Sequence, residues 1–224
     1  MIPERIHYCW FGGGQPSWLN QRCIESWKKA HPDFAVSRWD ESNSPIHHPY
    51  VKSALERSVY AFAADYVRFW ALKEFGGIYL DTDMEVIRPL TPLFTANGAV
   101  GFESQGRVNA ALVIAPAAHR LSEKVLERID SYYVPRREFC ILPALVSRVL
   151  KDDKACAIDI YPPEYFYPYN PYDPSADGQF MYSSVKETTY AVHHWEKSWG
   201  NKTLRRKVIA RARRALPWEW RIVY

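Results

Sequence analysis

Two aspartates, Asp81 and Asp83, stand one residue apart in the segment GGIYLDTDMEV, residues 76–86. The residues before them predict a short buried strand that ends where the carboxylates begin. Two carboxylates this close repel each other and lose hydration when they are buried. A divalent cation that prefers oxygen ligands, such as Mn²⁺ or Mg²⁺, would relieve both costs and leave room for phosphate oxygens. The pattern suggests a metal clamp for a diphosphate, although a solvated turn would also explain an Asp-x-Asp pattern that stood alone.

A second pair of charged residues, Asp65 and Arg68, precedes the aspartates in the segment AFAADYVR. Their spacing of three residues places them on one face of a predicted helix. Taken alone, the pair is also consistent with an ordinary ion pair on a helix surface. That helix runs directly into the aspartate segment, so the two pairs together are more specific than either one.

The elements that must position these residues alternate between strand and helix. Hydrophobic periodicity predicts strands at residues 5–11, 34–40, 78–80 and 84–87, and helices at residues 16–30 and 50–75. Gly76 and Gly77 provide the left-handed stop that such a helix favours. The aromatic, proline-rich residues 161–174 are expected to form an ordered loop. The alternation predicts an α/β fold with a mostly parallel central sheet, in which ligands bind at the carboxyl ends of the strands.

Composition limits the class of protein. With 224 residues, 47% of them hydrophobic, the chain suits one globular domain with a sizeable core. No apolar run approaches the length that spans a bilayer, and the N-terminus lacks the apolar region of a signal peptide. The four cysteines show no metal-binding spacing. We therefore expect buried, reduced thiols in a cytoplasmic protein.

The run YAFAADYVRFWALKEFGGIYLDTDMEVIRP, residues 60–89, resembles the signature of the DXD glycosyltransferases of family 32. Other segments resemble further motifs of that family in the same order, namely IHYCWFGGG (6–14), NAALVIA (109–115), IYPPEYFYP (160–168) and HHWEKSW (193–199). The family groups capsular polysaccharide transferases with fungal initiating mannosyltransferases, and the catalytic domains of glucosylating bacterial toxins are similar. The resemblance implies a single-domain GT-A fold, a UDP- or GDP-sugar donor, a divalent metal (usually Mn²⁺), and hexose transfer with retention at the anomeric carbon.

The resemblance also implies roles on the nucleotide-sugar donor. Trp10 matches the aromatic residue that stacks on the base, although a tryptophan at a strand end can also be a core residue. Phe11 and Gly12 would let the backbone approach the nucleotide. The residues expected to contact ribose, sugar or diphosphate are Asp65, Arg68, Tyr79, Asp81, Asn109, Ser198 and Trp199. Tyr79 is equally consistent with a core residue of its strand.

For the metal, the resemblance implies Asp83 as a direct ligand and Asp81 as a ligand through water. One of His193 and His194 would complete the site. No residue is implied as a catalytic base, because in a same-face mechanism the leaving phosphate itself deprotonates the acceptor. Double displacement would instead need a carboxylate beside the anomeric carbon, for which Glu103 is a candidate by position alone.

Two other classes of protein share part of the pattern. In haloacid-dehalogenase-type phosphatases an Asp-x-Asp also follows a strand, but Met84 and Glu85 stand where a glycine and then Thr or Val are expected. A non-catalytic nucleotide-sugar binding module would be expected to have a broken site. Here Asp65, Arg68 and the two aspartates are all present, so the transferase interpretation is preferred.

Residues 202–224 form a basic tail after a transferase domain at residues 1–201. The tail holds eight Lys and Arg against one Glu, whereas residues 1–201 hold 21 basic and 24 acidic residues. A helix over residues 202–216 would be basic and modestly amphipathic, which is typical of an element on a membrane surface. The alternative is a solvated or nucleic-acid-binding C-terminus. We expect a glycan or lipid-linked oligosaccharide as acceptor, reached at the inner face of the cytoplasmic membrane, and no nucleic-acid partner.

Removing residues 202–224 is expected to weaken binding to vesicles that contain anionic lipid, since each Lys or Arg near such a surface adds about 1 kcal/mol. Co-sedimentation of the full and shortened chains with anionic and with neutral vesicles measures the difference. Equal binding of the two chains to anionic vesicles would contradict a membrane role for the tail.

Overall fold

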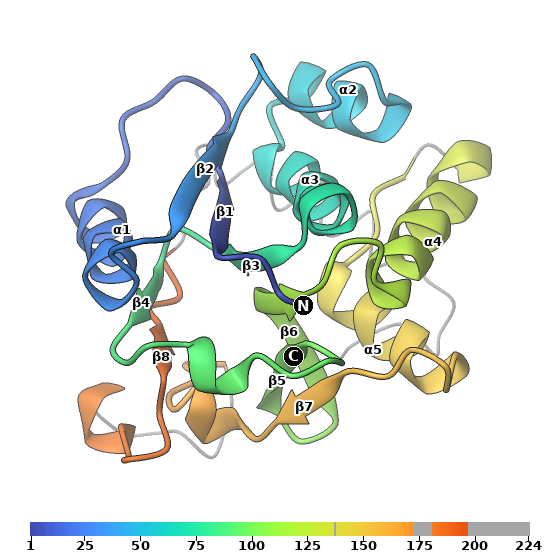
Figure 1. Ribbon diagram of the computed structural model, residues 1–224. Coiled ribbons are helices and arrows are strands. Elements are labelled where there is room, and N and C mark those ends of the chain that lie inside the picture. The colour runs from blue at the N-terminus through green and yellow to red at the C-terminus, as the bar shows by residue number, and fades with distance from the viewer. Residues whose placement is uncertain (137, 173–180, 197–224) are drawn as a thin grey trace.

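The structure, a computed structural model, describes residues 1–136, 138–172 and 181–196 (Figure 1). A six-stranded sheet with the order β2-β1-β3-β6-β5-β7 runs through this part of the chain. Three of its five strand pairings are parallel, which confirms the predicted α/β fold with a mostly parallel sheet. The strands are β1 (Arg5–Cys9), β2 (Ala35–Trp39), β3 (Gly77–Leu80), β5 (Ala99–Ser104), β6 (Arg107–Ala115) and β7 (Asp159–Tyr161).

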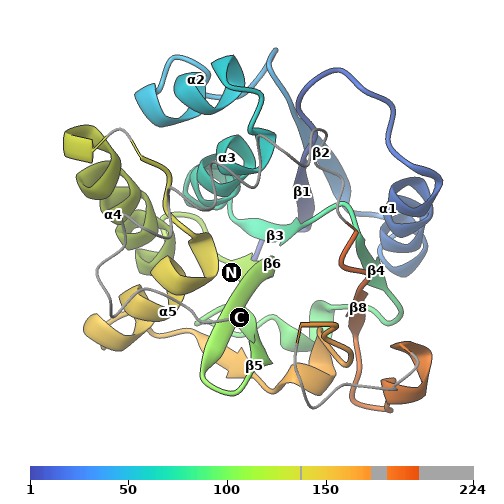
Figure 2. The ribbon, with the colours of Figure 1, turned by 180° about the vertical axis from the view of Figure 1, so that it is seen from behind.

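Helices cover both faces of this sheet (Figures 1 and 2). One face carries α2 (Pro49–Glu56), α3 (Tyr60–Phe75), α4 (Arg120–Arg136) and α5 (Leu142–Asp152). The other face carries α1 (Trp18–Ala30) and a second, two-stranded sheet of β4 (Met84–Val86) and β8 (Ala191–His193). Short 3-10 helices lie at Thr91–Leu93, Pro163–Tyr165 and Met181–Ser184.

Side chains of the central strands alternate between two hydrophobic cores. In β3, Tyr79 packs in the core under α2 to α5, whereas Ile78 and Leu80 pack in the core on the α1 side. Because both faces of β3 are covered, all four of its residues are buried. The strand therefore ends in the protein interior, where a polar group that loses its water needs a partner within the protein.

The predicted single helix over residues 50–75 is wrong, because the structure breaks it into α2 and α3. The break lies at Ser58, whose φ of 53° is in the left-handed region. Leu55 and Ala54 accept backbone hydrogen bonds from Ser58 and Val59, which close the turn. The break lets α2 fold back so that its apolar side packs on α3 in the common core, which a continuous helix would carry away from it.

Several other expectations can be compared with the fold. Gly76 and Gly77 both have positive φ, as the predicted helix stop requires, and a Cβ on Gly77 would meet the Arg5 carbonyl oxygen at 2.5 Å. All four cysteines are free and buried. Among the described residues, none of the helices has the length and hydropathy needed to cross a bilayer. The tail, and residues 173–174 at the end of the predicted aromatic loop, lie outside the described residues.

His7 is a buried polar residue of β1 that connects three elements. Its Nε2–H donates to the Gly76 carbonyl at 2.8 Å, and its Nδ1 accepts from the Trp39 indole at 3.1 Å. An indole N–H can only donate, so Nδ1 carries no proton and the ring is neutral. Burial lowers the pKa of His7 to about 4.

We expect the free energy of unfolding to fall as the pH is lowered from about 6.5 to about 4, because the unfolded chain protonates His7 and the folded chain resists it. Above about pH 6.5 the contribution of neutral His7 to the free energy of unfolding is fully present. Its complete loss below about pH 4 lowers that free energy by about 3 kcal/mol. Urea unfolding at several pH values, for wild type and His7→Gln, measures it. His7→Gln should flatten the dependence in this window, and the exposed His47→Gln should not. Parallel curves for wild type and His7→Gln would contradict the assignment.

Candidate functional site

The turn after β3 is where the chain leaves the main sheet. The Asp81 N–H still donates to the Ala111 carbonyl of β6 at 2.8 Å, and the Asp81 carbonyl accepts from Met84 N–H at 3.0 Å. The predicted strand at residues 84–87 is present as β4, but it pairs antiparallel with β8 instead of continuing the main sheet. The register sets Met84 opposite His193 and thereby brings His193 beside Asp83.

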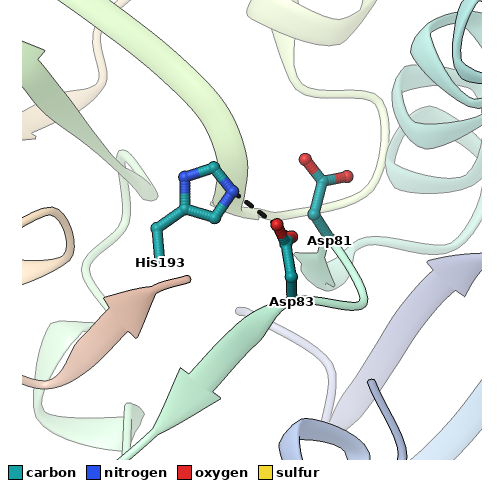
Figure 3. Close-up of side chains that lie close together, drawn as sticks. All are labelled: Asp81, Asp83 and His193. Atoms are coloured by element: carbon teal, nitrogen blue, oxygen red, sulfur yellow. Dashed lines mark ion pairs between the residues drawn. The ribbon is translucent and has the colours of Figure 1, made fainter. Parts of the chain in front are cut away.

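Asp81, Asp83 and His193 form a cluster whose side chains could hold a metal ion, among the residues that the structure describes (Figure 3). One ligand atom from each lies within 4.8 Å of the others. Figure 3 shows His193 pointing from β8 at the Asp83 carboxylate, with the Asp81 carboxylate beside it. The His193 Nε2 lies 3.2 Å from Asp83 Oδ1. Asp83 and His193 are buried and Asp81 is half-buried, so the cluster is open on one side only.

The two buried members of the cluster stabilise each other's charge. Burial alone would raise the pKa of Asp83, but His193 and the Glu196 N–H hold it below its usual range. Burial likewise opposes protonation of His193, yet the neighbouring carboxylates, Asp83 first, outweigh it and raise the pKa of His193. The His193 Nδ1 has no hydrogen-bond partner among the described residues. The orientation of the His193 ring is therefore set by the contact of its Nε2 with the carboxylates.

Arg68 is the centre of a second cluster that adjoins the first. From α3 its guanidinium reaches Asp65 Oδ1 and Asp81 Oδ1, both at 3.1 Å, and donates to the Ala110 carbonyl of β6 at 2.6 Å. The guanidinium also lies 4.6 Å from the centre of the Tyr79 ring, and the Tyr79 hydroxyl donates to Asp81 Oδ1 at 3.1 Å. The structure therefore joins the two charged pairs that the sequence places 13 residues apart.

The Arg68 side chain is buried, which sets the electrostatics of this cluster. Burial would lower the pKa of Arg68. The charges of Asp81, Tyr79 and Asp65 outweigh this effect and raise the pKa above its usual value. Burial raises the pKa of Asp65 to about 7, although Arg68 opposes the rise. The expectation of a solvated ion pair on a helix surface does not apply, since the Asp65 and Arg68 side chains are only 14% and 6% exposed.

Asn109 lies in β6 and is held on both ends of its amide. Its Nδ2 donates to Glu103 of β5 at 2.5 Å, and its Oδ1 accepts from the Ala111 N–H at 2.8 Å. Glu103 also forms an ion pair with Arg107 at 2.5 Å. Burial raises the pKa of Glu103, and Arg107 opposes the rise. In this structure, therefore, the Glu103 carboxylate is engaged with Arg107 and Asn109.

The residues expected to stack on the base or to let the backbone approach the nucleotide directly follow β1. Trp10 is half-buried, and its indole N–H donates to the Gly14 carbonyl at 2.5 Å. The Phe11 side chain packs in the core. Gly12 has a φ of 88°, and its N–H donates to the Glu41 carboxylate at 2.7 Å. A Cβ at this position would lie 2.5 Å from the Tyr60 ring, so a larger residue could not replace Gly12 without rearrangement.

The structure separates the two adjacent histidines. His193 joins the cluster of aspartates, whereas the His194 Nε2 lies 2.8 Å from Glu85 and does not take part. Ser198 and Trp199 lie outside the described residues. Glu196 was missed by the sequence reasoning, although its N–H donates to Asp83 at 2.8 Å. Its position within the HHWEKSW motif was the available signal.

Comparisons with known proteins agree with this geometry. Residues 18–99 match the family model of the glycosyltransferase sugar-binding region containing a DXD motif. Over these residues the chain is similar to DXD glycosyltransferases. The matched residues include Asp65 and Arg68 as well as the two aspartates, so the predicted resemblance to DXD glycosyltransferases is confirmed.

Relatives and solved structures extend the similarity beyond residues 18–99. The chain is 29% identical to a lactosylceramide 4-alpha-galactosyltransferase of Rattus norvegicus over 149 residues, which are 60% of this chain and 40% of that protein. It is 34% identical to the inositol phosphoceramide mannosyltransferase 3 of Schizosaccharomyces pombe over 100 residues, 41% of this chain and 27% of that protein. It thus spans less than half the length of these two relatives.

The PaToxG glycosyltransferase has a similar structure, with a TM-score of 0.58 at 18% identity over 69% of this chain and 72% of that chain. The structural neighbours are GT-A glycosyltransferases, and the expected GT-A fold is confirmed.

Replacing Arg68 with Ala is expected to lower the free energy of unfolding by about 3–5 kcal/mol, because it leaves buried carboxylates without their cation. Arg22→Ala is a matched control, since Arg22 also pairs with an acid three residues away but is 61% exposed. The control should change stability little. Urea unfolding measures both, and equal effects of the two substitutions would show that Arg68 is not the buried counter-charge described above.

Proposed function

We propose that this chain is a retaining, metal-dependent glycosyltransferase that moves a hexose from a UDP- or GDP-sugar to a sugar hydroxyl of a glycan or lipid-linked oligosaccharide. Synthesis of a surface polysaccharide is the setting that such a reaction suits. The observation that carries the proposal is the cluster of Asp81, Asp83 and His193 at the carboxyl end of β3, in contact with the Arg68 cluster.

The donor atoms of the cluster fit a divalent cation. Two carboxylates and one imidazole form a mixed oxygen and nitrogen set, which supports Mn²⁺ over Mg²⁺, because Mg²⁺ favours oxygen ligands. When bound, such an ion would stabilise the negative charge that develops on the leaving nucleoside diphosphate. The buried Asp83 and His193 would hold the ion, and Asp81 is exposed enough to share it with a phosphate or a water.

The other residues of the site would bind and orient the donor. Trp10 is half-buried at the end of β1, where one face of the indole could stack on the base. Asp65 lies within hydrogen-bond distance of Arg68 and could accept a hydrogen bond from a ribose or sugar hydroxyl. Asn109 is fixed by Glu103 and would present its amide in one orientation. Groups held in this way need little reorganisation when charge develops in the transition state.

A same-face mechanism fits the arrangement of carboxylates better than double displacement. A nucleophilic carboxylate must be free to attack the anomeric carbon. Glu103 is bound to Arg107 and Asn109, and Asp81 is held by Arg68 and Tyr79. Held in this way, Asp81 is also a poor nucleophile for a phosphatase of the haloacid-dehalogenase type.

The proposed acceptor is supported by the names of the relatives. They act on lactosylceramide and inositol phosphoceramide, in which the acceptor is attached to a lipid. A lipid-linked oligosaccharide at the inner face of the cytoplasmic membrane would match this class of acceptor. The basic tail would bring the site to that surface, although it lies outside the described residues.

A metal-dependent rise in melting temperature with one of UDP, GDP and CDP is expected, since a ligand that binds only the folded state stabilises it by about 2.7 kcal/mol at 100 times its dissociation constant. Thermal unfolding with Mn²⁺ and with EDTA measures it. Asp83→Asn should abolish the rise, whereas the exposed Glu25→Gln should keep it. A folded wild-type sample that responds to none of these nucleotides would overturn the proposal.

A further inference from the structure

Glu196 connects the segment after β8 to the first turn of α1. Its Oε2 accepts hydrogen bonds from the Ser17 hydroxyl at 3.0 Å and from the Asn20 amide at 2.8 Å. Ser17 is the N-cap of α1, and Ser17 and Asn20 also bond to each other in a capping box. Asn20 is fully buried. Two hydrogen bonds therefore hold the Glu196 carboxylate at the N-terminus of α1, which is the positive end of the helix dipole.

The main chain next to Glu196 holds Asp83. The Glu196 N–H donates to Asp83 Oδ2 at 2.8 Å, and the His194 N–H donates to the Asp83 carbonyl at 3.0 Å. Because Oδ2 is held in this way, Oδ1 is the oxygen that faces His193. The orientation of the Asp83 carboxylate thus depends on the backbone of the Glu196 segment.

Trp195, which lies between His194 and Glu196, has a backbone conformation that needs support from its surroundings. Its φ is 56°, which a residue with a large side chain rarely adopts. Its indole N–H donates to the Tyr169 carbonyl at 2.7 Å, and its ring lies 4.2 Å from the His193 ring. Such strain persists only where the surrounding contacts fix it, and the Glu196 carboxylate is the anchor on the other side of this residue.

We propose that Glu196 is a positioning residue of the metal site, which acts by clamping its own N–H against Asp83 Oδ2. The inference rests on the proposed function, because it takes Asp83 and His193 as metal ligands. The Glu196 carboxylate makes its bonds with α1, so it would act through the backbone and not as a ligand. Partners that orient a ligand in this way commonly affect metal affinity 10–100-fold.

A role limited to capping α1 is the competing explanation, and the variants separate the two. Glu196→Ala removes both hydrogen bonds to α1, whereas Glu196→Gln keeps an oxygen that can accept hydrogen bonds from Ser17 and Asn20. Ser26→Ala is the matched control for stability. It removes a hydrogen bond from α1 to the Val86 N–H of β4, 2.9 Å long, without touching Asp83.

Calorimetric titration with Mn²⁺ alone, together with thermal unfolding, tests the proposal. We expect Glu196→Ala to weaken Mn²⁺ binding at least 10-fold, Glu196→Gln to restore most of it, and Ser26→Ala to lower the melting temperature with unchanged Mn²⁺ affinity. If Glu196→Ala does not fold, Glu196→Asp serves in its place. Its shorter side chain strains the hydrogen bonds to Ser17 and Asn20 and should weaken Mn²⁺ binding by a smaller factor.

Two outcomes would overturn the proposal in different ways. Wild-type Mn²⁺ affinity in Glu196→Ala, or in Glu196→Asp where only that variant folds, would leave the metal site intact and show that Glu196 only caps α1. A folded wild-type protein that binds no Mn²⁺ would remove the proposed metal site together with the role of Glu196.

Discussion

The desolvation of two carboxylates at the end of a buried strand is the constraint on which the rest of the site depends. Asp81 and Asp83 follow β3, whose four residues are all buried, and water cannot solvate both side chains there. Each carboxylate faces a different basic side chain. Arg68 reaches Asp81 from α3, and His193 reaches Asp83 from β8. The two halves of the site are therefore supplied by segments on either side of the aspartates in the sequence.

The pairing of β4 with β8 decides which histidine faces the aspartates. Met84 is opposite His193 in this ladder, and successive side chains of a strand point to opposite faces. His193 therefore meets Asp83, whereas His194 meets Glu85. A slip of one residue would exchange the two histidines, so the register carries information that composition and spacing do not contain.

The local parts of the site could be predicted from the sequence. The spacing of Asp65 and Arg68, the strand before Asp81 and the stop at Gly76 follow from short-range geometry, and the structure agrees with each of them. The break at Ser58 could not be predicted, because it is favoured by the packing of α2 on α3 and not by a local breaker such as Gly or Pro. Contacts between segments that are distant in the sequence could not be predicted from it either.

Glu196 and Glu103 illustrate why such contacts escape a reading of the sequence. Glu196 bonds to Ser17, 179 residues away, and although it stands in the HHWEKSW motif, the local sequence does not indicate this partner. Glu103 bonds to Arg107 and Asn109 across the hairpin of β5 and β6, whose register contains irregularities between residues 100 and 104. The identity of a buried carboxylate's partners is thus fixed by strand register and helix packing.

Asp81 links the two clusters into one electrostatic unit. Its Oδ1 is bound by Arg68 and Tyr79, and the same carboxylate belongs to the group with Asp83 and His193. A cation beside Asp83 would therefore compete with Arg68 for the charge of Asp81, and the pairing of Arg68 with Asp65 would strengthen as a result. The residues proposed to bind metal and those proposed to bind donor hydroxyls cannot respond independently, because they share one carboxylate in a largely buried site.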